Sequence, residues 1–247
     1  DKLSAGERAD EAPEGKGSQV PRQMVSIFDR VGTYRGKKDL PHHYLPLAEL
    51  HLDQNAIFPS EIMDAKATVD AYDTLKKSLE TISSQMIDDP ETYLENLQAA
   101  MQRYTWCLPS AYYHSLPDVS LYDHSRMTAA LAVCLVERPG DEVERLLAAV
   151  RATFAEKATP QDADLLAQPA AILVGGDISG IQKFLYTLSA RKAAQMLRGR
   201  SFYLQLLTEA VMRLLLRELG IPGVNVIYSG GGHFFLLAPL SAAEKLP

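Results

Sequence analysis

The sequence predicts an α+β fold, with a ferredoxin-like βαββ core towards its C-terminal end and a mainly helical segment before it. Three observations lead to this prediction. A short apolar run, AAILVGGD, ends in an acid at Asp177. A long amphipathic stretch follows and stops at Gly220, and two strand-like runs then flank a glycine turn. Strand, helix and hairpin in this order are the first part of a ferredoxin-like domain, in which the hairpin lies beside the first strand.

Helical spacing recurs through the segment before this core. The apolar side chains of residues 69–86 lie three and four positions apart, as on one face of a helix. A second helix is predicted from Pro90 to about residue 104. The run LYDHSRMTAALAVCLVE predicts a third, capped by Asp118 or Ser120, and VERLLAAVRATF a fourth. Prolines within residues 40–59 favour short extended pieces there.

The elements of the predicted core follow from local patterns. The continuous apolar run before Asp177 suits a central strand that is buried on both faces. Leucines at helical spacing predict a long crossover helix that Gly220 and Pro222 end. Alternation over residues 224–228 predicts a strand, residues 229–232 a tight turn, and HFFLLAP the returning strand.

Composition excludes several classes of protein. A net charge of -6 over 247 residues argues against a protein that coats nucleic acid through a broad basic surface. Cys107 and Cys134 are too far apart for a zinc finger and too few for a disulfide framework, which favours a reducing, cytoplasmic compartment. The longest apolar runs fall short of the roughly 20 residues that span a membrane. The chain begins without Met, and we expect further sequence on both sides.

Asp177 and the glycine turn are the candidate functional elements. In polymerase-like and cyclase-like domains, one acid at the end of the first strand and one or two acids on the hairpin hold divalent metal, because phosphoryl transfer needs cations that bridge the reacting oxygens. Here the first acid is present as Asp177. The glycines at residues 230–232 leave bare main chain that a ribose or phosphate can approach closely.

Two resemblances sharpen this reading. Asp177-Ile178 together with residues 228–234 resemble the core of diguanylate cyclases, the GGDEF family, with Gly232 and His233 standing where that family carries its two acids. An active cyclase or polymerase of that kind is therefore disfavoured.

More specifically, the chain resembles the large signature subunit of type III CRISPR complexes, closest to the III-A form. The resemblance rests on GGDISGIQKFLYTLS, LRGRSFYLQLLTEA, YSGGGHFFLLAP, WCLPSAYY and DVSLYDHSRMTAALA. It extends over nearly the whole chain.

This resemblance implies three parts. Residues 1–22 would be the C-terminal remnant of an HD nuclease domain and a linker. Residues 23–165 would be a mainly helical connecting segment with short extended pieces. Residues 166–247 would be the first Palm domain, GGDEF/cyclase-like and truncated after the glycine hairpin. The family's HD motifs and its GGDD motif do not occur in this sequence; on this resemblance Asp1 would be the last HD metal ligand, which alone cannot hold a metal.

The resemblance also implies a function. In this family the first Palm binds ATP with a second, GGDD-bearing Palm, which holds most of the Mg²⁺ or Mn²⁺, and the pair makes cyclic oligoadenylate in antiviral defence when target RNA is recognised. The implied partners are the backbone and crRNA-tag-binding subunits of the complex and, through them, CRISPR RNA and target RNA. No membrane is implied. The intact subunit is expected to be a nucleotidyltransferase and a single-stranded DNase, and no catalytic residue is assigned to this chain.

We therefore predict a nucleotide-binding site formed by the first strand end and the hairpin. Its predicted members are Asp177, Ser179, Gly180, Ser229, Gly230, Gly231, Gly232 and His233, with Arg198 and Arg200 at the start of the long helix as candidate phosphate contacts.

Each assignment has a structural alternative. Asp177 and Ser179 could instead cap the following helix. The two arginines fit a basic pair on a solvated helix face more commonly than a phosphate site. Asp123-His124 fits a hydrogen-bonding role better than a metal site. The alternative for the whole chain is a scaffold that docks CRISPR subunits without binding nucleotide.

Overall fold

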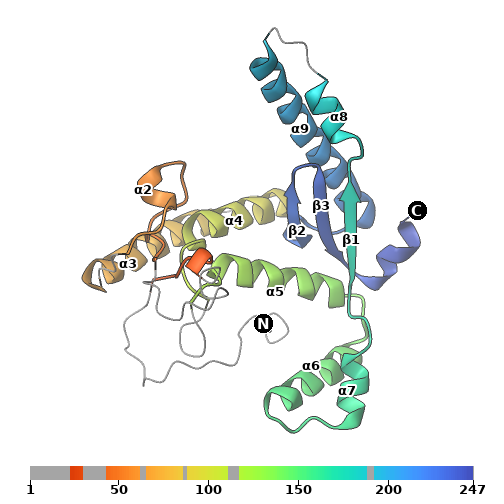
Figure 1. Cartoon of the computed structure of the whole chain (residues 1–247). Helices are drawn as coiled ribbons and strands as arrows, with labels where there is room; N and C mark the ends of the chain where they lie inside the picture. The colour runs from red at the N-terminus through yellow and green to blue at the C-terminus, as the bar shows by residue number, and fades with distance from the viewer. Residues whose placement is uncertain are drawn as a thin grey trace. The chain divides into compact units, whose positions relative to one another are not determined.

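The structure is a computed structural model that describes residues 23–29, 43–61, 65–85, 88–110, 117–187 and 192–246 (Figure 1). Its internal contacts divide the chain into two units, one ending at Arg126 and one beginning at Met127. The division falls inside helix α5 (Leu121–Leu135). Asp1 and the rest of residues 1–22 lie outside the described residues, and so does the predicted HD remnant.

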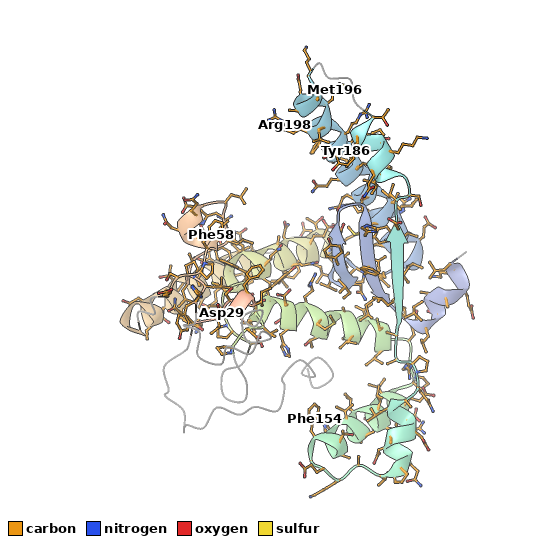
Figure 2. The ribbon with its side chains drawn as sticks, in the orientation of Figure 1. Asp29, Phe58, Phe154, Tyr186, Met196 and Arg198 are labelled. Atoms are coloured by element: carbon orange, nitrogen blue, oxygen red, sulfur yellow. The ribbon has the colours of Figure 1, made fainter. Side chains whose placement is uncertain are left out.

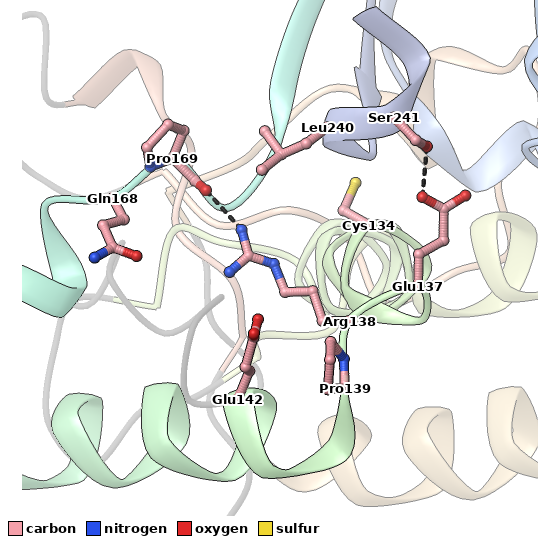
Figure 3. A pocket seen from close by; sticks show the side chains of 9 residues that line it. All are labelled: Cys134, Glu137, Arg138, Pro139, Glu142, Gln168, Pro169, Leu240 and Ser241. Atoms are coloured by element: carbon pink, nitrogen blue, oxygen red, sulfur yellow. Dashed lines mark hydrogen bonds between the residues drawn. The ribbon is translucent and has the colours of Figure 1, made fainter. Parts of the chain in front are cut away.

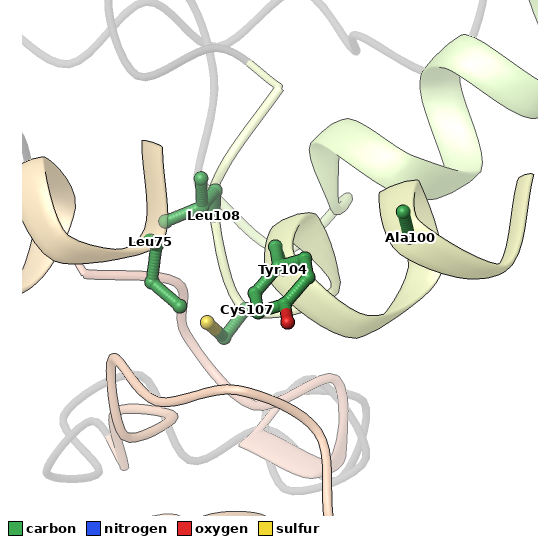
Figure 4. Packing of buried hydrophobic residues seen from close by; sticks show 5 residues of the cluster. All are labelled: Leu75, Ala100, Tyr104, Cys107 and Leu108. Carbon is green, nitrogen blue, oxygen red and sulfur yellow. The ribbon is translucent and has the colours of Figure 1, made fainter. Parts of the chain in front are cut away.

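The first unit is built around two predicted helices, α3 (Ala65–Ser83) and α4 (Pro90–Thr105). Short extended pieces and the one-turn helix α2 (Gln54–Ile57) precede them, as the prolines predicted. A cluster of buried side chains forms the core of the unit (Figure 4): Leu75, Ala100, Tyr104, Cys107 and Leu108. Trp106 packs against this cluster and donates its indole N–H to the Ala48 carbonyl at 2.9 Å.

Side-chain caps fix the starts of these helices. The Asp89 carboxylate accepts the Thr92 amide at 2.9 Å, and Pro90 occupies the first turn of α4, where its missing N–H costs no hydrogen bond. At α5 the Ser120 hydroxyl accepts the Asp123 amide at 2.9 Å. Ser120 therefore caps α5, as predicted.

The second unit contains the remaining helices and the sheet. Helices α6 (Gly140–Phe154) and α7 (Pro160–Leu166) pack together. Helix α8 (Ile181–Tyr186) lies beside α9 (Ala193–Leu219), which ends at Gly220 with φ +71. Two short 3-10 turns, η2 (Gly223–Asn225) and η3 (Leu240–Lys245), flank the hairpin.

The sheet has the predicted ferredoxin-like connectivity. Its strands are β1 (Ile172–Asp177), β2 (Val226–Gly230) and β3 (His233–Ala238), in the spatial order β1-β3-β2. Both pairings are antiparallel, so β1 and β2 run parallel on either side of β3, and α9 provides the crossover between them. Met212 of α9 packs against Phe234 and Leu236 of β3. The α+β, Palm-like fold predicted from the sequence is confirmed.

A buried amide joins the hairpin to α5. Asn225 is fully buried, and its side-chain nitrogen donates to the carbonyl of Leu237 at 2.7 Å and to that of Ala130 at 3.3 Å. The acceptors belong to β3 and α5, so one side chain holds a strand and a helix together.

Three local predictions were wrong. Burial in β1 alternates along the strand, and Leu173 is 64% exposed, because among the described residues only one face of the sheet is covered. Val224 lies in η2, because the chain makes a 3-10 turn before β2 begins at Val226. Helix α9 begins at Ala193, so Arg198 and Arg200 lie in its second turn. No helix in the described part of the chain is both long and apolar enough to cross a membrane.

Candidate functional site

The strand register brings the end of β1 and the glycine hairpin together. Asp177 is paired with His233 across β1 and β3, and His233 is paired with Gly230 across the hairpin. One residue further, the Ile178 amide donates to the Gly232 carbonyl at 2.9 Å. The predicted adjacency of the strand-end acid and the hairpin tip is therefore confirmed.

Two glycines make the turn itself. Gly231 and Gly232 have φ of +62 and +86, the pair of left-handed conformations that a two-residue hairpin turn requires. Ser229 and Gly230 were predicted to belong to this turn, but they lie within β2 because the ladder continues as far as the Gly230–His233 pair. The turn is thus shorter than the run of glycines suggested.

The two turn glycines differ in their surroundings. A Cβ on Gly232 would lie 2.0 Å from Cδ1 of Ile181, so only glycine lets the first turn of α8 approach the hairpin this closely. A Cβ on Gly231 would have no heavy atom within 4 Å. The main chain at Gly231 is therefore open to an incoming molecule.

A hydrogen-bonded histidine–carboxylate pair occupies the position where a cyclase would carry further acids. The His233 Nδ1 lies 2.9 Å from Asp177 Oδ1, and both side chains are more than half exposed. The Nδ1–H of His233 donates to the carboxylate whether the ring is neutral in that tautomer or protonated. The hairpin therefore presents a histidine, with Nε2 as a second ring nitrogen, to any group that approaches Asp177.

The site does not fit a metal centre built from this chain alone. Mg²⁺ requires near-octahedral oxygen ligation, and Asp177 brings one carboxylate, already engaged by His233. Among the described residues there is no group of three or more His, Cys, Asp or Glu that could hold a metal ion. Any metal here would need ligands from a nucleotide or a second domain.

The glycines that precede Asp177 have a packing role that was not predicted from the sequence. A Cβ on Gly176 would lie 2.1 Å from the Phe234 ring, and one on Gly175 would lie 3.1 Å from Phe235. The side-chain-free stretch of β1 therefore makes room for two aromatic side chains of β3 next to the site, Phe234 on the buried face of the sheet and Phe235 on the exposed face. The sequence signal for this packing was the pairing of the GGD run with the HFF run, which sets each glycine opposite a phenylalanine.

Ser179 and Gly180 lie at the start of α8, but the capping alternative is wrong. The N-cap is Gly180 in a left-handed conformation with φ +82, and no side chain makes a cap hydrogen bond to this described helix. Because α8 has only six residues, it offers little macrodipole for a phosphate. Any contact to a nucleotide from this loop would have to come from the Ser179 hydroxyl or from main chain.

The two arginines have different surroundings. The Arg200 guanidinium donates to the carbonyls of Phe184 and Thr187, the second at 2.9 Å, and lies 5.1 Å from the centre of the Phe184 ring. Arg200 therefore ties α8 to α9, which disfavours a role as a phosphate contact. Arg198 is exposed and makes one long bond, 3.4 Å, to the Ala194 carbonyl.

Asp123 has the hydrogen-bonding role predicted for it. Asp123 accepts the Ser120 hydroxyl at 2.8 Å and lies 3.4 Å from Arg126, while His124 is a buried residue.

A separate hollow of about 440 Å³ lies elsewhere in the second unit (Figure 3). Arg138 reaches the Pro169 carbonyl at 2.6 Å, and Glu137 accepts the Ser241 hydroxyl. Burial raises the pKa of the Cys134 thiol at its wall to about 11, which keeps the thiol protonated and unreactive. Arg138 and Glu137 thus make hydrogen bonds within the chain that stabilise the fold.

Comparisons with known proteins agree with this geometry. The family model described as Csm1 subunit domain B matches residues 170–246. A relative from Methanocaldococcus jannaschii, named CRISPR system single-strand-specific deoxyribonuclease Cas10/Csm1 (subtype III-A), is 30% identical over 96% of this chain and 31% of its own length. A relative of the same name from Mycobacterium tuberculosis is 35% identical over 71% of this chain and 21% of its own length.

Solved structures give the same answer. A Csm1-Csm4 cassette in complex with cA4 matches 99% of this chain and 28% of that chain, with a TM-score of 0.63 and 25% identity. A Csm1-Csm4 cassette in complex with pppApApA matches 93% of this chain and 28% of that chain, with a TM-score of 0.62 and 26% identity. The chain thus spans less than a third of the length of these relatives. With β1 and the hairpin arranged as a Palm-like sheet, these matches show that the chain belongs to the Cas10/Csm1 family of type III CRISPR large subunits.

Proposed function

We propose that residues 166–247 are the first Palm of a type III large subunit and supply one wall of an ATP-binding site. A second Palm, which carries the GGDD motif and lies outside this chain, would supply most of the metal ligands, and the pair would make cyclic oligoadenylate when target RNA is recognised. The observation that carries the proposal is the pairing of Asp177 with His233 beside an acid-free glycine turn.

The chemistry of the turn supports a role in holding the nucleotide. Gly231 exposes main chain with no neighbour where its side chain would be, so a phosphate or ribose can reach the backbone amides. A protonated His233 would add a cation next to the phosphates. Without acids on the hairpin, this half lacks the carboxylates that bind the activating metals, so it holds the nucleotide while the other half provides the reacting centre.

The relatives support the choice of ligand. Csm1-Csm4 cassettes that resemble this chain along 93% or more of its length are in complex with cA4 and with pppApApA, which are both built from adenosine nucleotides. We extend this ligand class, ATP with Mg²⁺ or Mn²⁺, to the present chain. We further propose that its partners are the other type III subunits, with CRISPR RNA and target RNA bound through the complex in the cytoplasm.

A substitution in the turn tests the proposal in the intact subunit. Gly231→Arg places a long side chain over the open main chain and should abolish ATP binding, measured by isothermal titration calorimetry, and with it oligoadenylate synthesis. Gly231→Asn is the matched control, since asparagine tolerates positive φ and adds only a short side chain. Normal product formation by Gly231→Arg, or oligoadenylate synthesis by the isolated chain, would refute the proposal that this Palm holds the nucleotide while the second Palm supplies the metal ligands.

A scaffold without nucleotide affinity is the second candidate, favoured by the engagement of the Asp177 carboxylate by His233. Calorimetry with ATP and Mg²⁺ on the assembled complex distinguishes the two. A scaffold predicts the same heat of binding for wild type and Asp177→Ala, whereas a nucleotide wall predicts weaker binding in the variant.

A further inference from the structure

Two aromatic rings are exposed on the face of the sheet that the described helices leave open. Tyr228 of β2 is 53% exposed and Phe235 of β3 is 41% exposed. The neighbours of Phe235 along β3, Phe234 and Leu236, are buried against Met212 of α9 on the other face. Adjacent exposed rings on one face indicate an interaction surface more strongly than single exposed rings do.

The strand register places these rings on the same face as the Asp177–His233 pair. Residues opposite each other in antiparallel strands share a face, and so do residues two apart along one strand. Two adjacent rows therefore cross the three strands on this face: Asp177–His233–Gly230 and Gly175–Phe235–Tyr228. The rows are about 7 Å apart, because each residue advances a strand by roughly 3.4 Å.

Glycines make room for both rings beside the site. A Cβ on Gly175 would lie 3.1 Å from Cε1 of Phe235, so this ring lies over the main chain of β1. A Cβ on Gly230 would lie 2.9 Å from the hydroxyl oxygen of Tyr228, so the tyrosine side chain reaches along β2 towards the hairpin tip. The two ring centres are 6.5 Å apart, with the planes tilted by 41°. We call Tyr228 and Phe235 the aromatic pair.

Exposure alone does not distinguish these rings, but their position does. Phe154 of α6, labelled in Figure 2, is more exposed at 61%, yet it lies outside the sheet. In a complete ferredoxin-like domain, the fourth strand pairs with the edge of the first strand and both helices cover the same face. The rest of such a domain would therefore leave the aromatic pair uncovered, one row from Asp177 and His233.

We propose that the aromatic pair binds the purine base of the nucleotide, adenine in the case of ATP, while the hairpin tip meets the ribose and phosphates. The assignment rests on the proposed function and adds the group that recognises the base. A purine stacks on exposed rings because the contact removes apolar surface of both partners from water. The step of about 7 Å from the aromatic pair to His233 leaves room for the ribose between base and phosphates.

Isothermal titration calorimetry on the intact subunit tests the assignment with two probes, ATP and inorganic tripolyphosphate, each with Mg²⁺. Tripolyphosphate carries phosphate charge but no base. Phe235→Ala and Tyr228→Ala should each weaken ATP binding by roughly tenfold, as expected for the loss of a stacking partner, without weakening the binding of tripolyphosphate. Tyr228→Phe keeps the ring and should therefore bind ATP more tightly than Tyr228→Ala does.

Three further variants separate stacking from a loss of fold. Phe154→Ala removes an exposed ring outside the sheet, and Leu173→Ala removes a 64% exposed side chain two rows from Asp177 on the same face. Both should bind ATP as wild type does. Phe235→Leu keeps an apolar side chain over Gly175 without a ring. This variant should lose ATP affinity while its urea midpoint stays that of wild type.

Fluorescence provides a direct readout of stacking. The emission of 2-aminopurine riboside triphosphate falls when its base stacks on an aromatic ring. Binding to the wild-type subunit should therefore quench this probe, and the quenching should be smaller in Phe235→Ala and Tyr228→Ala.

Four results would overturn the proposal. Unchanged ATP affinity in Phe235→Ala and Tyr228→Ala would place the base elsewhere, and the nucleotide wall would still stand if Gly231→Arg abolishes ATP binding. Equal losses for ATP and tripolyphosphate would show that the rings do not act on the base. A lowered urea midpoint in Phe235→Leu with intact ATP binding would show that protein covers the rings. A wild-type subunit without ATP affinity would refute the nucleotide wall and this assignment together.

Discussion

Replacing Gly232 with alanine isolates the contact that positions α8 against the hairpin. The new Cβ would lie 2.0 Å from Cδ1 of Ile181, and the residue would keep φ +86. The left-handed conformation costs an alanine about 1–2 kcal/mol. Displacing a packed side chain adds roughly 1–3 kcal/mol. We therefore expect Gly232→Ala to lower the free energy of unfolding by about 2–5 kcal/mol.

Urea unfolding of the full chain, followed by circular dichroism, measures this loss. Gly231→Ala is the matched control, because it also has a positive φ but open space around its Cβ, so only the conformational cost of about 1–2 kcal/mol applies. Adding Ile181→Ala to Gly232→Ala should recover part of the loss, since the clashing methyl is removed. Equal losses for the two glycine variants, with no recovery in the double variant, would refute the packing argument.

Three further predictions follow from buried or exposed polar groups. Asn225→Ala should destabilise the chain by about 2–4 kcal/mol in urea unfolding, because the buried Ala130 carbonyl and the partly buried Leu237 carbonyl lose their donor; a loss below about 1 kcal/mol would contradict this role. Burial raises the pKa of the Cys134 thiol to about 11 in the folded chain, while the unfolded thiol ionises near pH 9, so the stabilisation from this group is lost as pH rises from about 9 to 11. Cys134→Ala should therefore show a shallower fall in urea midpoint over that pH range. An identical fall in the variant and the wild type would contradict this role of the thiol. Asp177→Ala should change thermal stability by less than about 1 kcal/mol, because its pair with His233 is more than half exposed; a large loss of melting temperature would assign the pair to the fold rather than to a ligand.

The sequence predicted the order of elements well because the signals were local. Gly220 stops α9 in the left-handed conformation, Pro90 and Ser120 mark helix starts, and the ferredoxin-like order placed the hairpin beside β1. These features depend on residues a few positions apart. Such signals survive in the fold because tertiary contacts do not oppose them.

The errors occurred where tertiary contacts decide the outcome. An apolar run such as that of β1 does not reveal whether one or both faces will be covered, and α9 begins a turn earlier than its apolar periodicity suggested. The short helix α7, held by a capping box between Thr159 and Asp162, carried too few apolar residues to be noticed, although Thr159 followed by Pro160 was a usable signal.

The candidate site was predictable in position but not in chemistry. Topology alone placed Asp177 next to the hairpin, whereas the contact between Asp177 and His233 depends on the register of β1 and β3. The capping alternative for Ser179 failed because Gly180 takes the N-cap position. Arg200 could not be assigned from sequence, because its acceptors are the last carbonyls of another helix.

Photo-cross-linking with 8-azido-ATP tests the nucleotide wall most directly, in the intact subunit with Mg²⁺ or Mn²⁺ present and with the modified peptides identified by mass spectrometry. Labelled adenine attached within residues 172–180 or 226–238, and competed away by unlabelled ATP, is the predicted result. Competable labelling confined to peptides outside both ranges would show that the nucleotide rests against some other part of the subunit.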